Sequence, residues 1–218
     1  MKYNKQLLAA ALCALSSLAM AGGFDGPSVQ AGIALTAAQT ELRNFSPDGK
    51  VSDSSVIGSL ALGYSKAYGQ LNLAGGLFAL LGSPKSGSLN SFDASPTGTG
   101  GLWSDEFKLK QVWGLSIEPG YNLSESTLVY AKLSYVQATG QNRYDYSRAP
   151  VPEGAGSAEA KHSGFGIGAG VKFKLSSKLY GVVEFQQVSF DSKRYYGDVP
   201  ETYKPSLLSG SVGLGYQF

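Results

Sequence analysis

Cysteine and histidine are almost absent from this sequence. Its 218 residues include one cysteine, Cys13, and one histidine, His162. A disulfide needs two cysteines, and a typical zinc site needs a cluster of cysteine or histidine ligands. The composition therefore excludes a disulfide framework and a typical zinc site, and we expect no metal and no cofactor.

Long apolar runs and helical periodicity are also missing. After residue 21, no segment has the about 20 apolar residues that a transmembrane helix needs, and no long stretch repeats with period 3.6. The chain has 18 basic and 16 acidic residues. This balance provides no strongly basic surface for a polyanion, so we expect no nucleic-acid partner.

The first 21 residues predict a secretory signal peptide. Lys2 and Lys5 precede an apolar run at 7–18, and Ala19-Met20-Ala21 has the small residues of a cleavage site. Cleavage there removes Cys13 and leaves 218 − 21 = 197 residues. We expect this mature chain, residues 22–218, to form one domain.

Glycine and tyrosine are abundant, with 29 and 13 residues, and apolar residues recur at every second position. Runs of about ten residues with period two, separated by turn residues, are typical of transmembrane β-barrel strands. We therefore predict an all-β fold, an eight-stranded antiparallel up-and-down transmembrane barrel. The alternating stretches are 29–37, 56–64, 71–81, 113–121, 127–135, 165–175, 179–185 and 212–218.

The connections between these stretches alternate in length. Tight turns are predicted at 64–68, 123–127 and 175–179, each an apolar residue, a serine, two small or polar residues and an apolar residue. Short turns at one end and long loops at the other are the arrangement of barrels with periplasmic turns and extracellular loops. The long polar connections are 43–50, 83–105, 141–160 and 192–205.

Aromatic residues on the apolar face are spaced like two girdles. Trp113 and Tyr121 are eight residues apart, as are Phe165 and Phe173. Eight residues of a tilted strand span roughly 21 Å along the membrane normal, close to the thickness of the apolar band. Pro119 shares this face and predicts a bulge or a lost ladder bond, because proline has no N–H.

The last stretch alternates up to the C-terminal residue, with Val212, Leu214, Tyr216 and Phe218 on one face. With the signal peptide and the eight strands, it resembles the small eight-stranded outer-membrane β-barrel family of OmpX-like and opacity-type proteins and the membrane half of OmpA. The segment E-P-G-Y-N-L-S-E-S-T-L-V-Y-A-K-L-S-Y (118–135) is similar to the central hairpin of porin-like surface antigens.

This resemblance implies a location in the cell outer membrane of a Gram-negative bacterium. It also implies that the final strand is the signal read by the barrel assembly machinery. Members of this family differ widely in activity, so the resemblance says more about architecture than about function.

If the apolar residues face lipid, four charged residues face the lumen: Glu118, Lys132, Lys172 and Glu184. The turn register places Glu118 opposite Lys132, and Glu184 diagonal to Lys172. Two interpretations compete: paired charges in a structural plug, or a narrow gated ion path. We favour the plug because eight strands leave an interior that side chains can fill. Inward Tyr130, Tyr180 and Phe78 are expected to help fill it.

One histidine–serine pair raises the possibility of an enzyme. Some small barrels that modify lipid A resemble one another in using a histidine and a nearby serine, and here Ser163 follows His162. The deacylase motif has one residue between the two, so this sequence departs from it. Asp145, Glu159 and Asp191 are candidate orienting residues, but nothing distinguishes one of them. We expect no catalytic site.

Other ligand motifs are weak. The glycines of 164–170 lack the spacing of a phosphate loop, and Asp191, Asp198 and Glu201 are better explained as a solvated loop than as a calcium site. Tyrosine and arginine are dense in 142–148 and 191–205, which suits either recognition or a membrane rim. We assign Arg194, Tyr195 and Tyr196 to the rim.

The sequence therefore predicts a monomeric, non-enzymatic surface protein of the cell envelope, acting through four extracellular loops. Its expected partners are outer-membrane lipid, lipopolysaccharide and the assembly machinery; an extracellular ligand is not identified. The alternatives are a narrow porin-like channel, a lipid A-modifying enzyme, and a soluble lipocalin-like barrel, whose apolar face would point inward.

Overall fold

The computed structural model describes residues 23–43, 49–93, 101–148, 151–195 and 201–218. These residues form ten β-strands joined in one antiparallel sheet. In this described part of the chain, no helix is long and apolar enough to cross a membrane. The strands are β1 (Gly26–Arg43), β2 (Gly49–Tyr68), β3 (Leu71–Leu81), β4 (Lys85–Asp93), β5 (Gly101–Ser124), β6 (Thr127–Arg148), β7 (Val151–Lys174), β8 (Leu179–Phe190), β9 (Lys193–Tyr195) and β10 (Glu201–Gln217).

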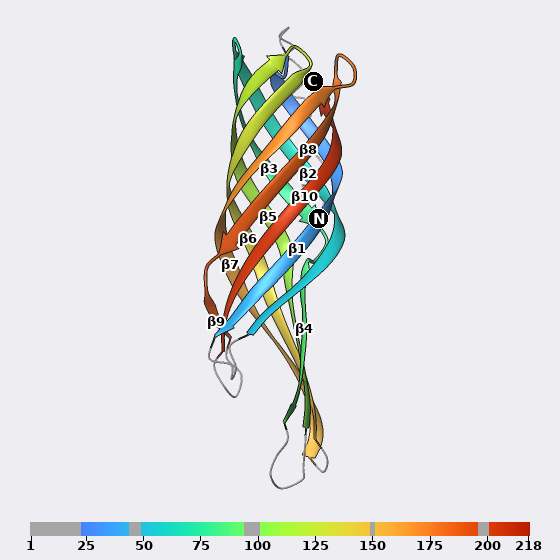
Figure 1. Ribbon diagram of the computed structural model, residues 1–218, viewed down its shortest axis with the longest axis vertical. Coiled ribbons are helices and arrows are strands. Elements are labelled where there is room, and N and C mark those ends of the chain that lie inside the picture. Colours follow the sequence, from blue (N-terminus) through green and yellow to red (C-terminus); the bar gives the residue numbers. More distant parts are fainter. Residues whose placement is uncertain (1–22, 44–48, 94–100, 149–150, 196–200) are drawn as a thin grey trace, which may run out of the picture.

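Eight of these strands close into a barrel, which confirms the predicted fold (Figure 1). The order is β1-β2-β3-β5-β6-β7-β8-β10, and β1 pairs with β10 to close the ring. Following paired residues once around, from Leu71 of β3, leads back to Leu81 of the same strand, a stagger of 81 − 71 = 10 residues. Such a stagger tilts the strands, as closure of a barrel requires.

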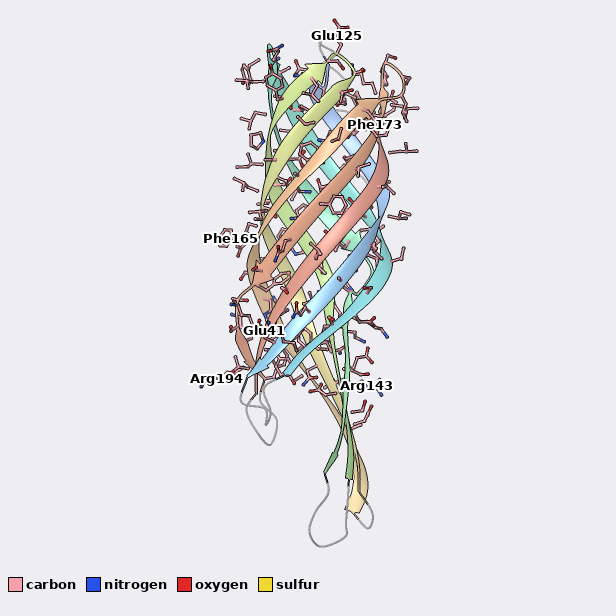
Figure 2. The ribbon with its side chains drawn as sticks, viewed as in Figure 1. Glu41, Glu125, Arg143, Phe165, Phe173 and Arg194 are labelled. Carbon is pink, nitrogen blue, oxygen red and sulfur yellow. The ribbon has the colours of Figure 1, made fainter. Side chains whose placement is uncertain are left out.

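The apolar residues of the alternating stretches point away from the barrel axis. Leu115, Ile167 and Leu214 are 51%, 66% and 59% exposed, whereas their neighbours along the strands are less exposed. Exposed large apolar side chains form a band around the barrel (Figure 2). An inward-facing apolar core, as in a lipocalin, is contradicted by these exposures, because only lipid makes such a surface favourable.

The first predicted turn is misplaced. The sequence predicts it at 64–68, but β2 continues to Tyr68, and Gly69-Gln70 connects it to β3. Gly69 has φ +65, a conformation that glycine adopts without a steric penalty. The predicted outward face of the two strands is nevertheless correct, because Tyr64 of β2 lies opposite Gly75 of β3 and both face outward.

At Pro119 the ladder between β5 and β6 is interrupted, as predicted. Pairs are formed at Ile117–Leu133 and Gly120–Tyr130, and the two residues between them on each strand do not pair. The register is unchanged across this gap, so the lost ladder bonds produce no slip.

The long connections contain more strand than the sequence predicts. Regions 83–105 and 141–160 were expected as loops, yet β4 occupies much of the first, and β6 and β7 most of the second. The outer parts of β4, β5, β6 and β7 leave the ring and extend well beyond it (Figure 1). We call this four-stranded extension, β4 with residues 101–110, 139–148 and 151–161, the projecting sheet.

Candidate functional site

Four charged side chains from four strands meet inside the barrel. Lys172 Nζ lies 2.8 Å from Glu118 Oε2, and Lys132 Nζ lies 2.8 Å from Glu184 Oε1 and 4.0 Å from Glu118 Oε1. The two lysine side chains are 11% and 5% exposed. Charges this buried are tolerated when they are paired and hydrogen-bonded. We call these four residues the central charge layer.

The partners agree only in part with the sequence-based register, because the predicted pair of Glu118 and Lys132 is present at 4.0 Å. The pattern paired Glu118 with Lys132 and brought Glu184 near Lys172, but the shortest contacts are the exchanged ones, Glu118 with Lys172 and Glu184 with Lys132. Each of these contacts passes over an intervening strand. In a narrow barrel the inward side chains converge on the axis, so cross-strand register does not decide which charges meet.

Glycines on β7 make the crossing from Lys132 to Glu184 sterically feasible. Gly168 and Gly170 lie opposite Lys132 and Tyr130 of β6. A Cβ atom at Gly170 would collide with the Tyr130 hydroxyl. With glycine there, Tyr130 Oη reaches across β7 and donates a 2.8 Å hydrogen bond to Glu184 Oε2 on β8.

Aromatic rings complete the central charge layer. Lys132 Nζ lies 4.4 Å from the centroid of the Phe78 ring, and Lys172 Nζ lies 4.7 Å from that of Tyr130. Two cavities of about 30 and 40 Å³ border these residues, enough for a few water molecules each. The central lumen is therefore packed with paired charges and rings, the arrangement expected of a plug.

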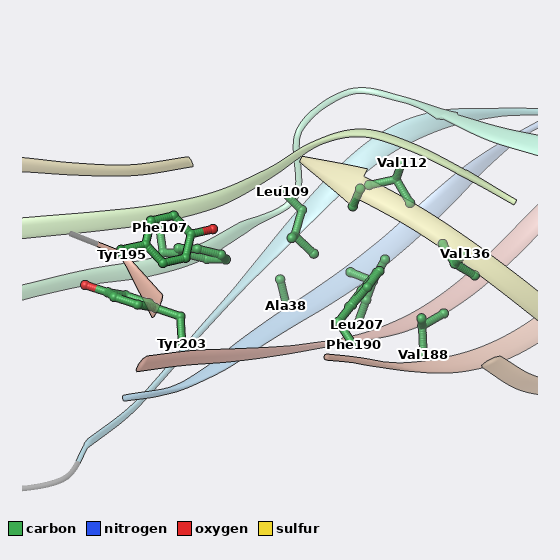
Figure 3. Packing of buried hydrophobic residues seen from close by; sticks show 11 residues of the cluster. Ala38, Phe107, Leu109, Val112, Val136, Val188, Phe190, Tyr195, Tyr203 and Leu207 are labelled. Carbon is green, nitrogen blue, oxygen red and sulfur yellow. The ribbon is translucent and has the colours of Figure 1, made fainter. Parts of the chain in front are cut away.

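A second interior layer lies towards the projecting sheet (Figure 3). Phe107 stacks on Tyr203 at 5.4 Å between ring centroids, and Tyr195 contacts both rings edge-on. Asn142 Nδ2 donates to Tyr203 Oη at 2.8 Å, so the tyrosine hydroxyl is satisfied. We call the whole cluster the outer aromatic layer: Ala38, Phe107, Leu109, Val112, Val136, Ala138, Val188, Phe190, Tyr195, Tyr203 and Leu207, together with His162.

A β-bulge on β5 supplies part of this layer. The register between β5 and β6 shifts between Lys110 and Trp113, and Gln111 has φ +52. Because of this shift, Leu109 and Val112 both point inward, although one is odd-numbered and the other even-numbered.

His162 is a packed residue of this layer. Its side chain is fully buried; Nε2 lies 2.8 Å from Tyr195 Oη, and Nδ1 lies 2.9 Å from the carbonyl oxygen of Asp191. Burial lowers its pKa below the usual value for histidine. Both ring nitrogens have hydrogen-bond partners, and burial favours the neutral imidazole.

The catalytic arrangement considered for His162 and Ser163 is not assembled. The backbone N–H of Ser163 donates to Asp191 Oδ1 at 3.0 Å, so this contact fixes the chain instead of activating a nucleophile. Of the three candidate orienting residues, only Asp191 lies beside His162. Asp145 pairs with Arg143, and Glu159 pairs with Lys110, both on the outward face.

The predicted rim residues divide into three cases. Arg194 is exposed, as a rim residue would be (Figure 2). Tyr195 was assigned to the rim, and this is wrong: it is 4% exposed because it packs into the lumen against Phe107 and His162. Tyr196 lies outside the described residues.

No cation site is assembled from the loop acids in the part of the chain that the structure describes. Asp191 Oδ2 lies 2.8 Å from Lys193 Nζ, and no group of three or more potential metal ligands occurs among these residues. Asp198 lies outside them. The hydrogen bond from Lys193 and that from the Ser163 backbone lower the pKa of Asp191, against the opposing effect of burial.

The four residues assigned to the aromatic girdles are exposed on the barrel exterior: Trp113, Tyr121, Phe165 and Phe173. Phe173 lies near the short-turn end of β7, and Phe165 lies further along the same strand towards the projecting sheet (Figure 2). Of the proposed assembly signal, Val212 and Leu214 face outward, and the rings of Tyr216 and Phe218 meet edge-on at 5.1 Å. Recognition of this strand by the assembly machinery stays a prediction.

The projecting sheet has an open edge along β7. Strand β8 pairs with β7 from Gly164 onward, so within the described residues Val151–Lys161 pair with β6 alone. The side chains of residues 155–161 are small or charged, and Ala155, Ser157, Glu159 and Lys161 are exposed. An unpaired edge presents backbone N–H and C=O groups that another strand can bind.

Sequence reasoning missed the outer aromatic layer and the residues at the opposite end of the lumen. Phe107 and Leu109 have the same parity as Trp113 and Leu115, so the pattern gives no sign that they point the other way. The lysine–glutamine step at 110–111, two polar residues in succession, is the signal of the bulge. Phe24 was unassigned, yet it is 2% exposed.

Comparison with known proteins agrees with this architecture. The family described as outer membrane protein beta-barrel domain matches residues 7–218, and no curated protein matches. Among solved structures, the outer membrane protease OmpT from Escherichia coli is 9% identical with a TM-score of 0.52, covering 93% of this chain and all of that one.

Two further solved structures are similar at 14% identity. For Neisserial surface protein A the TM-score is 0.49, and the alignment covers 88% of this chain and 97% of that one. For Ail, the attachment invasion locus protein of Yersinia pestis, the TM-score is 0.40, and the alignment covers 91% of this chain and 100% of that one. At these identities the likeness concerns the fold alone. The match over most of the chain, together with the closed ring of eight strands, shows that the chain belongs to the family of outer membrane protein beta-barrel domains.

Proposed function

We propose that this protein is a non-enzymatic interaction protein of the Gram-negative cell envelope, a closed barrel that displays the projecting sheet at the cell surface. The observation that carries this proposal is the open edge of β7, where Val151–Lys161 pair on one side only. Strands β4 and β9 and the outer parts of β5, β6 and β7, which fall within the regions predicted as extracellular loops, lie at this end (Figure 1).

The edge suits a polypeptide partner in an extended conformation. Addition of a strand satisfies backbone groups along the edge, and it requires little of the partner's sequence. Small side chains at Ala155, Ser157 and Ala158 leave the backbone accessible. Natural edge strands are often blocked by proline or charge; here Pro152, Glu159 and Lys161 lie towards the two ends of the segment.

A peptide-binding measurement tests this function. The full chain in lipid nanodiscs is mixed with a biotinylated ten-residue peptide of alternating threonine and valine. Of two successive strand residues, one directs its N–H towards β6 and the other towards the open edge. Proline removes the N–H, so one of the variants Ser157→Pro and Ala158→Pro loses an N–H that points to the open edge, and the other loses one that points to β6. The variant without the edge N–H is expected to lose peptide binding while keeping its heat-modifiable gel shift.

Lys161→Ala is the matched control, because it changes an exposed side chain and leaves the backbone edge intact. Absence of binding by the parent protein, or equal binding by both proline variants, would contradict the proposal.

The porin-like alternative is less well supported. The central charge layer and the outer aromatic layer fill the lumen in succession, and the cavities beside them have room for only a few waters each. Planar-bilayer recordings of purified protein are expected to stay at the lipid background. Stable conductance steps abolished by Glu118→Gln would favour the channel instead.

The enzymatic alternative has no supporting geometry at His162, whose ring nitrogens both contact other groups. Mass spectrometry of lipid A from cells with and without the intact gene tests it, and we expect unchanged acylation. Contact with outer-membrane lipid and lipopolysaccharide, delivery by the assembly machinery, and a monomeric state remain part of the proposal.

A further inference from the structure

The outward face of β5, β6 and β7 changes from apolar to basic beyond the apolar band. At the edge of the band, the rings of Tyr135 and Phe165 meet at 5.5 Å between centroids, and Trp113 is exposed on the same face. Lys110 lies 113 − 110 = 3 residues beyond the tryptophan. Lys161 lies 165 − 161 = 4 residues beyond the phenylalanine. These steps place both lysines roughly 8–10 Å further along the membrane normal, in the polar headgroup region that flanks the apolar band.

Six side chains on this outward face form two adjacent rows across the three strands. We call them the rim patch; its rows are Lys110–Thr139–Lys161 and, further from the apolar band, Lys108–Gln141–Glu159. The lysines of β5 are roughly 10–12 Å from the lysine of β7 at their Cα atoms, because neighbouring strands are about 4.8 Å apart. Long side chains from both strands therefore reach a ligand that lies between them.

The single carboxylate of the rim patch is already satisfied. Glu159 Oε1 accepts hydrogen bonds from Lys110 Nζ at 3.0 Å and from Gln141 Nε2 at 2.9 Å. Three lysines and one glutamate give the rim patch a net charge of 3 − 1 = +2. The surplus charge belongs to Lys108 and Lys161.

Other cations at this end of the barrel each have a carboxylate beside them. The pairs are Lys85 with Glu106 at 3.4 Å, Arg143 with Asp145 at 3.8 Å and Lys50 with Glu41 at 3.0 Å. Within the described part of the chain, Lys108 and Lys161 form no such pair. Their charges are therefore available to an anionic ligand.

We infer that the rim patch binds a phosphate group of a lipid in the outer leaflet. Lys108 and Lys161 approach the phosphate from β5 and β7, and only uncharged side chains lie between them on β6. Contacts between an ammonium and a phosphate are among the stronger hydrogen bonds in proteins. A lipid fits better than a soluble anion because the rim patch adjoins the exposed rings of the apolar band, where the acyl chains of the same molecule lie.

This inference specifies the lipopolysaccharide contact that belongs to the proposed function, and it rests on that contact. The phosphate meets side chains on the face of the sheet, whereas strand addition uses the backbone edge of β7. The two sites are therefore chemically separate, although Lys161 lies on the strand that carries both.

Lipid binding by the full chain tests the rim patch. The protein in detergent is titrated with bis-phosphorylated lipid A, and native mass spectrometry measures the fraction that retains one lipid. Lys108→Gln with Lys161→Gln is expected to weaken this binding at least about tenfold, because two charge-assisted contacts are lost. Equal binding by the parent and this double variant would overturn the inference.

The matched control is Lys50→Gln with Lys85→Gln. It removes the same charge from the same end of the barrel, but from lysines that have carboxylate partners. This control is expected to bind lipid A as the parent does, and the heat-modifiable gel shift shows that each variant is folded. An equal loss in both double variants would reveal a general effect of net charge and would overturn a defined site.

Two further ligands identify what the rim patch recognises. Lipid A without phosphate groups is expected to bind the parent at least about tenfold more weakly than the bis-phosphorylated form, and equal binding would overturn the phosphate contact. Inorganic phosphate in large excess is expected to leave the lipid bound. Displacement would assign the rim patch to free phosphate and overturn the lipid ligand.

The threonine–valine peptide distinguishes failure of this site from failure of the proposed function. The variant with Lys108→Gln and Lys161→Gln is expected to keep binding the peptide while it loses the lipid, because the backbone edge of β7 is intact. Loss of peptide binding in this variant would overturn the separation of the two sites.

Discussion

The central charge layer and the outer aromatic layer fill the same barrel in different ways. At the central level, β7 contributes Lys172 and glycines. Lys132 of β6 and Glu184 of β8 pair across these glycines, and Lys172 pairs with Glu118 of β5. At the outer level, β7 contributes His162, and rings from β5, β8 and β9 pack against it. The four charges of the central layer and both ring nitrogens of His162 have partners, so the barrel can be packed with either chemistry when its polar groups are satisfied in this way.

Removing one charge from the central charge layer is expected to reduce the stability of the barrel the most. Glu118→Ala leaves Lys172 without its 2.8 Å partner, and an uncompensated buried charge destabilises a protein by about 3–5 kcal/mol. Urea unfolding in lipid vesicles, followed by tryptophan fluorescence, measures this loss.

The matched control removes both partners together. Glu118→Leu with Lys172→Leu is expected to recover most of the stability, because replacing a buried pair by apolar groups is often nearly neutral. A single Glu118→Ala variant as stable as the parent would show that the charges are solvated and that the layer is not a plug.

A smaller effect is expected from filling the space above β7. Gly170→Ala places a methyl group against the Tyr130 ring and forces it away from Glu184, which should cost about 1–3 kcal/mol. Gly75→Ala, whose added methyl would have its nearest neighbour at 3.7 Å, is the control and should change stability by less than about 0.5 kcal/mol. The same unfolding measurement checks both, and equal losses would contradict the role given to the β7 glycines.

The outer layer should respond to pH through His162, which lies beyond the exposed apolar band. Burial lowers the pKa of His162 below its usual value of about 6.5, so at a pH between the folded and unfolded pKa values the unfolded chain binds one more proton than the folded chain. The free energy of unfolding should therefore fall as the pH drops below about 6.5, by at most about 1.4 kcal/mol per pH unit, and be constant above about 7.5.

The His162→Gln variant should lack this slope when unfolding midpoints are compared between pH 5 and 8. Asp191, whose pKa is lowered from 3.8, loses its contribution only at lower pH and does not overlap with this window. Parallel pH profiles of the parent and the variant would contradict the assignment of His162 to a buried, neutral state.

The smallest expected effect is a gain of stability at the bulge. Gln111 has φ +52, which glycine adopts more readily than other residues. Gln111→Gly should raise the free energy of unfolding by about 0.5–1 kcal/mol. Lys110→Gly, one residue away, should lower it, because glycine weakens an ordinary strand position. A loss in both variants would show that the conformation of Gln111 is not strained.

The lipid-facing surface of the barrel was predictable because the surrounding acyl chains impose a simple rule on the sequence. Every second residue from Trp113 to Tyr121 and from Phe165 to Phe173 must be apolar or small where acyl chains cover it. The eight strands and their outward faces follow from that alternation. The location of Glu118, Lys132, Lys172 and Glu184 in the lumen follows from the same rule.

The interior contacts were not predictable in the same way. Which lysine meets which glutamate depends on the barrel radius and on the room left by Gly168 and Gly170, and neither is encoded in a local pattern. Outside the membrane the alternation no longer distinguishes lipid from water, so the strands of the projecting sheet were expected as loops. The bulge at Gln111 then reversed the faces of Phe107 and Leu109.

The measurement that tests the account most directly is a nitroxide scan along β6, one spin label at a time from Val129 to Tyr135. If the apolar face meets lipid, collision with dissolved oxygen should be highest at 129, 131, 133 and 135 and low at 130, 132 and 134, in labelled protein reconstituted in lipid vesicles. Maxima at the even-numbered positions, or no alternation at all, would contradict the orientation on which every part of this account depends.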